Sequence, residues 1–143
     1  MKIFLDSSFL ISCVLKNDSN FDRAYELYNK ENIFNHECYI SNLIINEIVT
    51  VIGNKGTLQD AINNYNAFKD NFIIINEYEI DNFNDNVMNI YRKYNTKLSF
   101  TDSAILETMK CYNIENLVSF DKQFKIVDNI NLIKWKIIKS KIL

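Results

Sequence analysis

The chain has 143 residues, of which 48% are hydrophobic and 24% charged, and its formal net charge is −2. This length predicts one domain, residues 1–143, with room for a buried core. The charge excludes a protein that holds nucleic acid through bulk positive charge, but it is compatible with an enzyme that has a local basic rim.

Other features of the composition limit the functions and the cellular locations that we expect for the protein. Gly53 and Gly56 are the only glycines and proline is absent, so the chain has no glycine-rich loop that could cradle a nucleotide phosphate. The apolar run at the N-terminus is interrupted by Asp6, which is typical of neither a signal peptide nor a membrane span. The three scattered cysteines suit free thiols in a reducing compartment. We therefore expect a cytoplasmic protein that does not contact a membrane.

In chain order, the first half of the sequence predicts two short strands and four helices. The helical segments have apolar residues at intervals of three and four, whereas the strands are short apolar runs. The expected elements are a strand over 2–5, a helix after Ser7-Ser8, a helix over 21–30, a strand over 39–40, a helix over 42–52 that Ser41 caps and Gly53 ends, and a helix from Thr57 to about Asp70.

The second half continues the alternation of strands and helices. We expect a strand over 72–75 that is buried on both faces, a long helix over 79–95, a helix opened by Asp102, a strand over 117–118 and a last strand over 130–133. Strands that alternate with helices predict an α/β fold with a mainly parallel sheet and helices on both faces.

Four acidic residues occupy positions where ligands bind in such folds. Asp6 and Asp121 each follow a hydrophobic strand, and Asp102 opens the helix that precedes the second of these strands. Glu47 borders the apolar face of the helix over 42–52. If the two strands are neighbours, their carboxyl ends place the three aspartates around one cleft.

Each acid taken alone also has a structural explanation. Asp6 is a suitable helix cap, Ser99 and Asp102 resemble a capping box, Asp121 suits an Asx-turn, and Glu47 suits a solvent-exposed helix position. The conjunction of all four acids in comparable contexts is what favours a shared site over four separate caps.

A cluster of four carboxylates requires protons or a cation. Two unit charges about 4 Å apart repel by roughly 4 kcal/mol at an effective dielectric near 20. Ligands that are all oxygen, without histidine or cysteine, favour Mg²⁺ or Mn²⁺ over zinc. A hard cation with open water positions is suited to hydrolysing phosphodiesters.

Four segments together resemble a known family. The segments IFLDSSFLI, NLIINEIV, LSFTDSAIL and LVSFDKQF are similar, in order and spacing, to the motifs of PIN domains, specifically the small ribonucleases that act as VapC-type toxins of toxin–antitoxin pairs. The resemblance implies a single PIN-like nuclease domain, built as a three-layer α/β/α sandwich with a central five-stranded parallel sheet. It also implies metal-dependent endoribonuclease activity on RNA, a cognate antitoxin and a homodimer.

The resemblance also assigns roles to residues. Asp6 and Asp102 would bind the main metal directly, and Asp121 would complete that site or hold a second ion through water. Glu47 would coordinate the metal through water or orient the attacking water. Ser7 and Ser119 match hydroxyl positions that hydrogen-bond the carboxylates or the scissile phosphate.

The chain departs from the family in its scarcity of arginine, because it has only Arg23 and Arg92. Contacts with RNA phosphates would then fall to lysines, which act as point charges. The candidates are Lys97, Lys122 and Lys125. The lysines and Trp135 of the C-terminal tail are a further candidate, although a strand with one solvated face explains them equally well.

Two other functions remain open at the level of the sequence. The same fold and acids suit a housekeeping RNA-processing nuclease. They also suit a catalytically silent binding module in which the acids serve only as caps.

Overall fold

The structure is a computed structural model that describes residues 1–133. Its centre is one sheet in which every neighbouring pair of strands is parallel. The strands lie in the order β3-β2-β1-β4-β5. Their bounds are β1 Lys2–Leu5, β2 Glu37–Ser41, β3 Ile73–Ile75, β4 Asn116–Val118 and β5 Asn131–Ile133.

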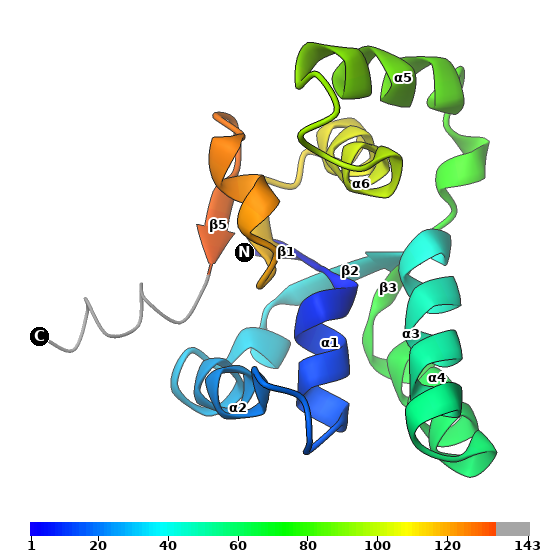
Figure 1. Cartoon of the computed structure of the whole chain (residues 1–143), viewed down its shortest axis with the longest axis vertical. Coiled ribbons are helices and arrows are strands. Elements are labelled where there is room, and N and C mark those ends of the chain that lie inside the picture. Colours follow the sequence, from blue (N-terminus) through cyan, green and yellow to red (C-terminus); the bar gives the residue numbers. More distant parts are fainter. Residues whose placement is uncertain (134–143) are drawn as a thin grey trace, which may run out of the picture.

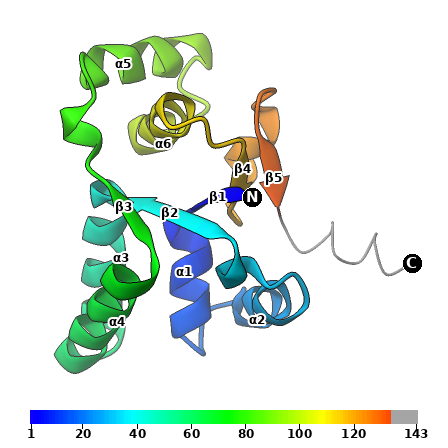
Figure 2. The same cartoon turned by 180° about the vertical axis from the view of Figure 1, so that it is seen from behind.

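Helices cover both faces of the sheet, as Figures 1 and 2 show. On one face lie α1 (Ser7–Val14), α2 (Phe21–Lys30), α3 (Asn42–Lys55) and α4 (Leu58–Asn71), and on the other lie α5 (Phe83–Lys93) and α6 (Phe100–Cys111). Three short 3₁₀ turns connect these elements: η1 Ile33–Asn35, η2 Glu77–Glu79 and η3 Lys122–Ile126. The predicted three-layer α/β/α sandwich with a five-stranded parallel sheet is confirmed.

The central strand β1 explains where the functional site can lie. Its residues Ile3, Phe4 and Leu5 are fully buried, because β1 has a neighbour on each side and helices on both faces. From β1 the chain builds the sheet outward through β2 and β3, and later adds β4 and β5 on the opposite side. The strand order therefore switches between β1 and β4, and the crevice at such a switch point is where open α/β sheets bind ligands.

The beginning and the end of α3 differ from the prediction. Ser41 occupies the N-cap position, but its side chain makes no capping hydrogen bond, so the predicted cap is wrong. The helix also continues through Gly53 to Lys55, and the N–H of Gly56 closes it on the carbonyl of Ile52 at 2.8 Å. A glycine inside a helix costs about 1 kcal/mol, which the buried face of α3 outweighs.

The segment after α4 also differs from the prediction. The strand expected to be buried on both faces is β3, which lies at the edge of the sheet as residues 1–133 form it. Ile73 is 45% exposed because, within these residues, β3 pairs with β2 alone. The single helix expected over 79–95 is divided into η2 and α5. Asn82 separates them with φ of 54°, a left-handed conformation that a right-handed helix excludes.

Three further expectations concern membrane-spanning helices, the cysteines and the C-terminal tail. Within residues 1–133, no helix is long and apolar enough to span a bilayer. The cysteines are all free thiols, as expected, and Cys111 is exposed. The proposed role of Trp135 and the tail lysines falls outside the residues that the structure describes.

Candidate metal centre

Asp6 lies at the switch point, in the crossing from β1 to α1. Its N–H donates to the carbonyl of Val118 at the end of β4, at 3.0 Å, which ties the two strand ends together. The residue is only 2% exposed. Although Asp6 occupies the N-cap position of α1, its side chain makes no capping hydrogen bond. The capping explanation therefore does not apply to Asp6, and its carboxylate is available to the cavity.

Two serine hydroxyls hold the Asp6 carboxylate in place. Ser119 Oγ donates to Asp6 Oδ2 at 2.6 Å and Ser8 Oγ donates to the same oxygen at 2.9 Å. Each hydroxyl also accepts a backbone N–H, Ser119 from Asp121 and Ser8 from Phe120, both at 3.0 Å. The two hydroxyl groups lie 3.2 Å apart. Because a hydroxyl has a single proton, these four bonds fix the direction of donation toward Asp6.

This hydrogen-bond network includes Ser119, which was predicted, and Ser8, which was not. Ser119 contacts Asp6 as expected, whereas Ser7 lies beside the carboxylate of Glu47. Ser8 was not predicted, although it lies two residues after the acid. A serine at that spacing can hydrogen-bond an aspartate side chain locally, so this spacing was the available signal.

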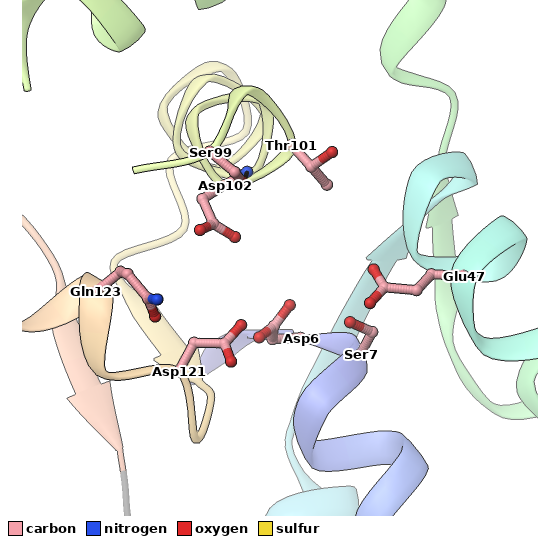
Figure 3. A pocket seen from close by; sticks show the side chains of 8 residues that line it. All are labelled: Asp6, Ser7, Glu47, Ser99, Thr101, Asp102, Asp121 and Gln123. Carbon is pink, nitrogen blue, oxygen red and sulfur yellow. Dashed lines mark hydrogen bonds between the residues drawn. The ribbon is translucent and has the colours of Figure 1, made fainter. Parts of the chain in front are cut away.

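Asp102 enters the site from the first turn of α6. Ser99 Oγ accepts the backbone N–H of Asp102 at 3.0 Å, so Ser99 is the helix cap. The Asp102 carboxylate points toward Asp6 and Asp121 in Figure 3. Capping and a functional carboxylate are thus compatible here, because the cap is supplied by Ser99 and Asp102 is half-buried at the cavity wall.

The four acids line one cavity, to which different parts of the chain contribute (Figure 3). Its volume is about 400 Å³. Asp6 and Asp121 lie side by side, Asp102 faces them from α6, and Glu47 lies with Ser7 at the α3 side. The lining residues are Asp6, Ser7, Glu47, Ser99, Thr101, Asp102, Asp121 and Gln123. Gln123 was not predicted, and as a single polar residue in a 3₁₀ turn it gave no signal.

The charges of these carboxylates oppose one another. Burial, followed by the charge of Asp6 and a hydrogen bond to its carboxylate, raises the pKa of Asp121 to about 7. Burial and the charge of Asp6 also raise the pKa of Asp102. The pKa of Glu47 is raised mainly by desolvation of its carboxylate, although the residue lies at the open rim and is exposed. All three raised pKa values indicate that negative charge in this cavity is unfavourable unless a proton or a cation balances it.

The side chains of the cavity fit a hard divalent cation. The lining side chains present carboxylate, hydroxyl and amide oxygens, with no histidine, cysteine or basic residue among those that the structure describes, and oxygen ligands are what Mg²⁺ and Mn²⁺ prefer. As the side chains stand, no group of three His, Cys, Asp or Glu residues within 1–133 is close enough to ligate one ion directly. Binding therefore requires side-chain rotation or bridging water, which Mg²⁺ ordinarily retains.

The predicted RNA-contacting lysines do not line the cavity, but they lie close in the sequence to residues that do. Lys97 lies in the loop before Ser99, and Lys122 and Lys125 lie in η3 directly after Asp121. All three are exposed, so their charges are available to a polymer that passes over the cavity.

The sequence matches the family model of the PIN domain over residues 3–130. No curated relative matches the sequence. Among solved structures, the chain is similar to the Mycobacterium tuberculosis toxin VapC20, described as cleaving the sarcin-ricin loop, with a TM-score of 0.75 and 17% identity over 92% of this chain and 98% of that one.

Two toxin–antitoxin structures are also similar to this chain. VapBC2 from Rickettsia felis, bound to a DNA fragment from its promoter, has a TM-score of 0.69 and 17% identity, covering 93% of this chain and 98% of that chain. A toxin–antitoxin complex from Klebsiella pneumoniae has a TM-score of 0.66 and 18% identity, covering 90% and 95%. At these identities the similarity establishes the fold.

Proposed function

Because the chain belongs to the PIN domain family, we propose that it is a Mg²⁺- or Mn²⁺-dependent endoribonuclease that hydrolyses RNA phosphodiester bonds. The observation that carries the proposal is the meeting of Asp6, Glu47, Asp102 and Asp121 in one cavity at the topological switch point. Four helix caps at unrelated sites would not line one shared cavity, in which burial and the charge of Asp6 raise the pKa values of Glu47, Asp102 and Asp121.

Each acid would have a distinct role toward the cation. Asp6 and Asp102 would hold it directly, and Asp121 would complete the site or hold a second ion through water. When bound, the cation would polarise the scissile phosphate and lower the pKa of a bound water. Glu47, which lies beside Ser7 at the rim, would coordinate the cation through water or orient the attacking water.

The serines and lysines support this arrangement. Ser8 and Ser119 hold the carboxylate of Asp6 in one orientation through their hydrogen bonds to Oδ2. Lys97, Lys122 and Lys125 would contact the RNA phosphates on either side of the cut and partly offset the negative charge of the cavity.

We further propose that the nuclease is the toxin of a type II toxin–antitoxin pair, in the cytoplasm and as a homodimer. The support is the similarity of the fold to toxins from three bacteria, two of them in complexes that include an antitoxin. Growth arrest on expression, relieved by the product of a small neighbouring gene, would support a toxin. RNA cleavage without growth arrest would instead indicate a processing nuclease.

The test of the catalytic proposal is cleavage of a labelled single-stranded RNA by the purified protein. We expect cleavage with Mn²⁺, none with EDTA, and none by Asp102→Asn. Asp85→Asn is the matched control, because Asp85 is an exposed acid in the first turn of α5 that does not line the cavity. Full cleavage by Asp102→Asn would contradict the proposal.

A further inference from the structure

Glu77 is a carboxylate that is completely buried, at 0% exposure, and lies outside the acidic cavity. It belongs to η2, which follows β3. Its two oxygens accept the N–H groups of Asn42 and Leu43 at 3.0 and 3.1 Å. These two residues begin α3, and N–H groups in the first turn have no partner inside their own helix. Glu77 therefore caps α3 from a turn 34 residues further along the chain.

No local side chain makes this cap. Ser41, at the N-cap position, forms no capping hydrogen bond. The next residue before Glu77 adds a second connection, because Asn42 Nδ2 donates to Asn76 Oδ1 at 2.8 Å. Three hydrogen bonds thus join the segment after β3 to the first turn of α3. A negative charge at this end of the helix is also favoured by the helix dipole.

The helix held in this way carries Glu47 to the cavity. Glu47 lies five residues after Asn42, or about 7.5 Å along a helix axis that rises 1.5 Å per residue. The isoleucines of α3 at positions 44, 48 and 52 are fully buried, but apolar burial is non-directional. The directional hydrogen bonds at the first turn add a constraint on the axial position and rotation of the helix, and so on the place of Glu47 relative to Asp6 and Ser7.

We propose that Glu77 is a positioning residue for the metal centre: by capping α3 it holds Glu47 in the orientation that serves the cation. This inference rests on the proposed function, and it adds a residue that acts through Glu47 without touching the ion or the RNA. It predicts that loss of the cap changes the requirement for metal and not only the stability of the fold.

The experiment compares Glu77→Gln, Glu47→Gln and the double variant. Glutamine retains one acceptor oxygen, so one of the two α3 N–H groups loses its partner. Two quantities are measured for each protein: the Mn²⁺ concentration that gives half-maximal RNA cleavage, and the increase in melting temperature on adding Mn²⁺. Loss of a residue that orients a metal ligand lowers metal affinity by about 10–100-fold. Because Glu47 would act on the cation through water, we expect the lower end of this range, so Glu77→Gln should raise the half-maximal Mn²⁺ concentration by about tenfold. In the Glu47→Gln background, the same change should add no further increase.

Thr57→Ala is the matched control, because Thr57 caps α4 through a capping box with Asp60 and does not line the cavity. It should lower the melting temperature without changing the Mn²⁺ requirement. If Glu77→Gln is too unstable to purify, Glu77→Asp makes the same comparison, because it keeps the charge but shortens the side chain by one methylene group.

The outcomes separate this inference from the proposed function. The inference would be overturned if a Glu77 variant lost stability as Thr57→Ala does but kept its Mn²⁺ requirement. It would also be overturned if Glu77→Gln raised the half-maximal Mn²⁺ concentration by the same factor in the wild-type and Glu47→Gln backgrounds. Mn²⁺ stabilisation of a wild-type protein that cuts no RNA would contradict the nuclease, while the melting-temperature comparison would still decide the role of Glu77. A wild-type protein on which Mn²⁺ has no effect would overturn both.

Discussion

Ser119 Oγ lies 2.6 Å from Asp6 Oδ2, so a residue that follows β4 holds the carboxylate that follows β1. The bond spans 113 positions of sequence and crosses the point at which the strand order of the sheet switches. The geometry of the acidic cavity consequently depends on the pairing of β1 with β4, in which Leu5 is registered with Val118.

Ser8→Ala should weaken both the fold and the metal centre. The change removes one donor to Asp6 and leaves the N–H of Phe120 without its acceptor, so the free energy of unfolding should fall by about 1 kcal/mol. Loss of a group that orients a metal ligand should reduce Mn²⁺ affinity by about 10–100-fold. Urea unfolding and Mn²⁺ titration of the cleavage rate measure the two effects.

Thr50→Ala is the control for this prediction. Its hydroxyl bonds the carbonyl of Asn46 on the exposed side of α3, so its removal should leave the Mn²⁺ requirement unchanged. An equal loss of metal affinity in both variants would contradict the specific role of Ser8.

The metal-free protein should become less stable as the pH rises from 5 to 8. Asp121 has a pKa of about 7 in the fold, above the ordinary aspartate value of 3.8. It therefore binds its proton more tightly when folded, and the stabilisation present at low pH is lost as the pH rises through about 7. Calorimetry in EDTA should show a lower melting temperature at pH 8 than at pH 5, and a smaller difference for Asp121→Asn. Parallel pH profiles for the two proteins would argue against this account.

Mn²⁺ should stabilise the folded protein by mass action. At a concentration one hundred times its dissociation constant, a ligand of the folded state adds about 2.7 kcal/mol to the free energy of unfolding. Asp102→Asn should lose most of this gain, and in metal-free buffer it should be at least as stable as the wild type because one repelling charge is removed. Thermal melts with and without Mn²⁺ at pH 8 measure both effects, and an equal Mn²⁺ gain in Asp102→Asn would count against its role as a ligand.

Single substitutions of Lys97, Lys122 or Lys125 by glutamine should weaken RNA binding without changing the Mn²⁺ requirement. A plot of the logarithm of the RNA-binding constant against the logarithm of the salt concentration has a negative slope. Each lost phosphate contact should make this slope less steep by about 0.7 for a single strand. The measurement is fluorescence anisotropy of labelled RNA bound to the Asp102→Asn protein over a range of salt. Lys69→Gln is the control. Lys69 lies in the last turn of α4, which leads to the start of β3, whereas the acidic cavity lies at the carboxyl ends of the strands. A slope that is unchanged in all three variants would exclude these lysines from the RNA path.

Local patterns in the sequence predicted most of the fold. The helix over 21–30 has the bounds predicted from its apolar spacing, and α4 starts directly after Thr57, within one residue of the predicted start. These features depend on residues within one or two turns of one another. The parallel sheet followed from the alternation of elements, and the strand order then brought Asp6 and Asp121 together.

The failures of the sequence prediction involve distant partners. The cap of α3 belongs to Glu77 and not to Ser41, because a buried carboxylate 34 residues away reaches the helix start. The helix expected over 79–95 is interrupted at Asn82, whose left-handed φ of 54° separates η2 from α5. Position in the sequence alone does not indicate which turn packs against which helix.

The most direct measurement is the anomalous difference density of a crystal soaked in Mn²⁺. We expect a manganese peak in the cavity, with carboxylate oxygens of Asp6 and Asp102 in its coordination sphere and Asp121 bound directly or through water. A saturating soak that leaves this cavity without manganese, or that places the ion on other residues, would contradict the assignment of the metal centre.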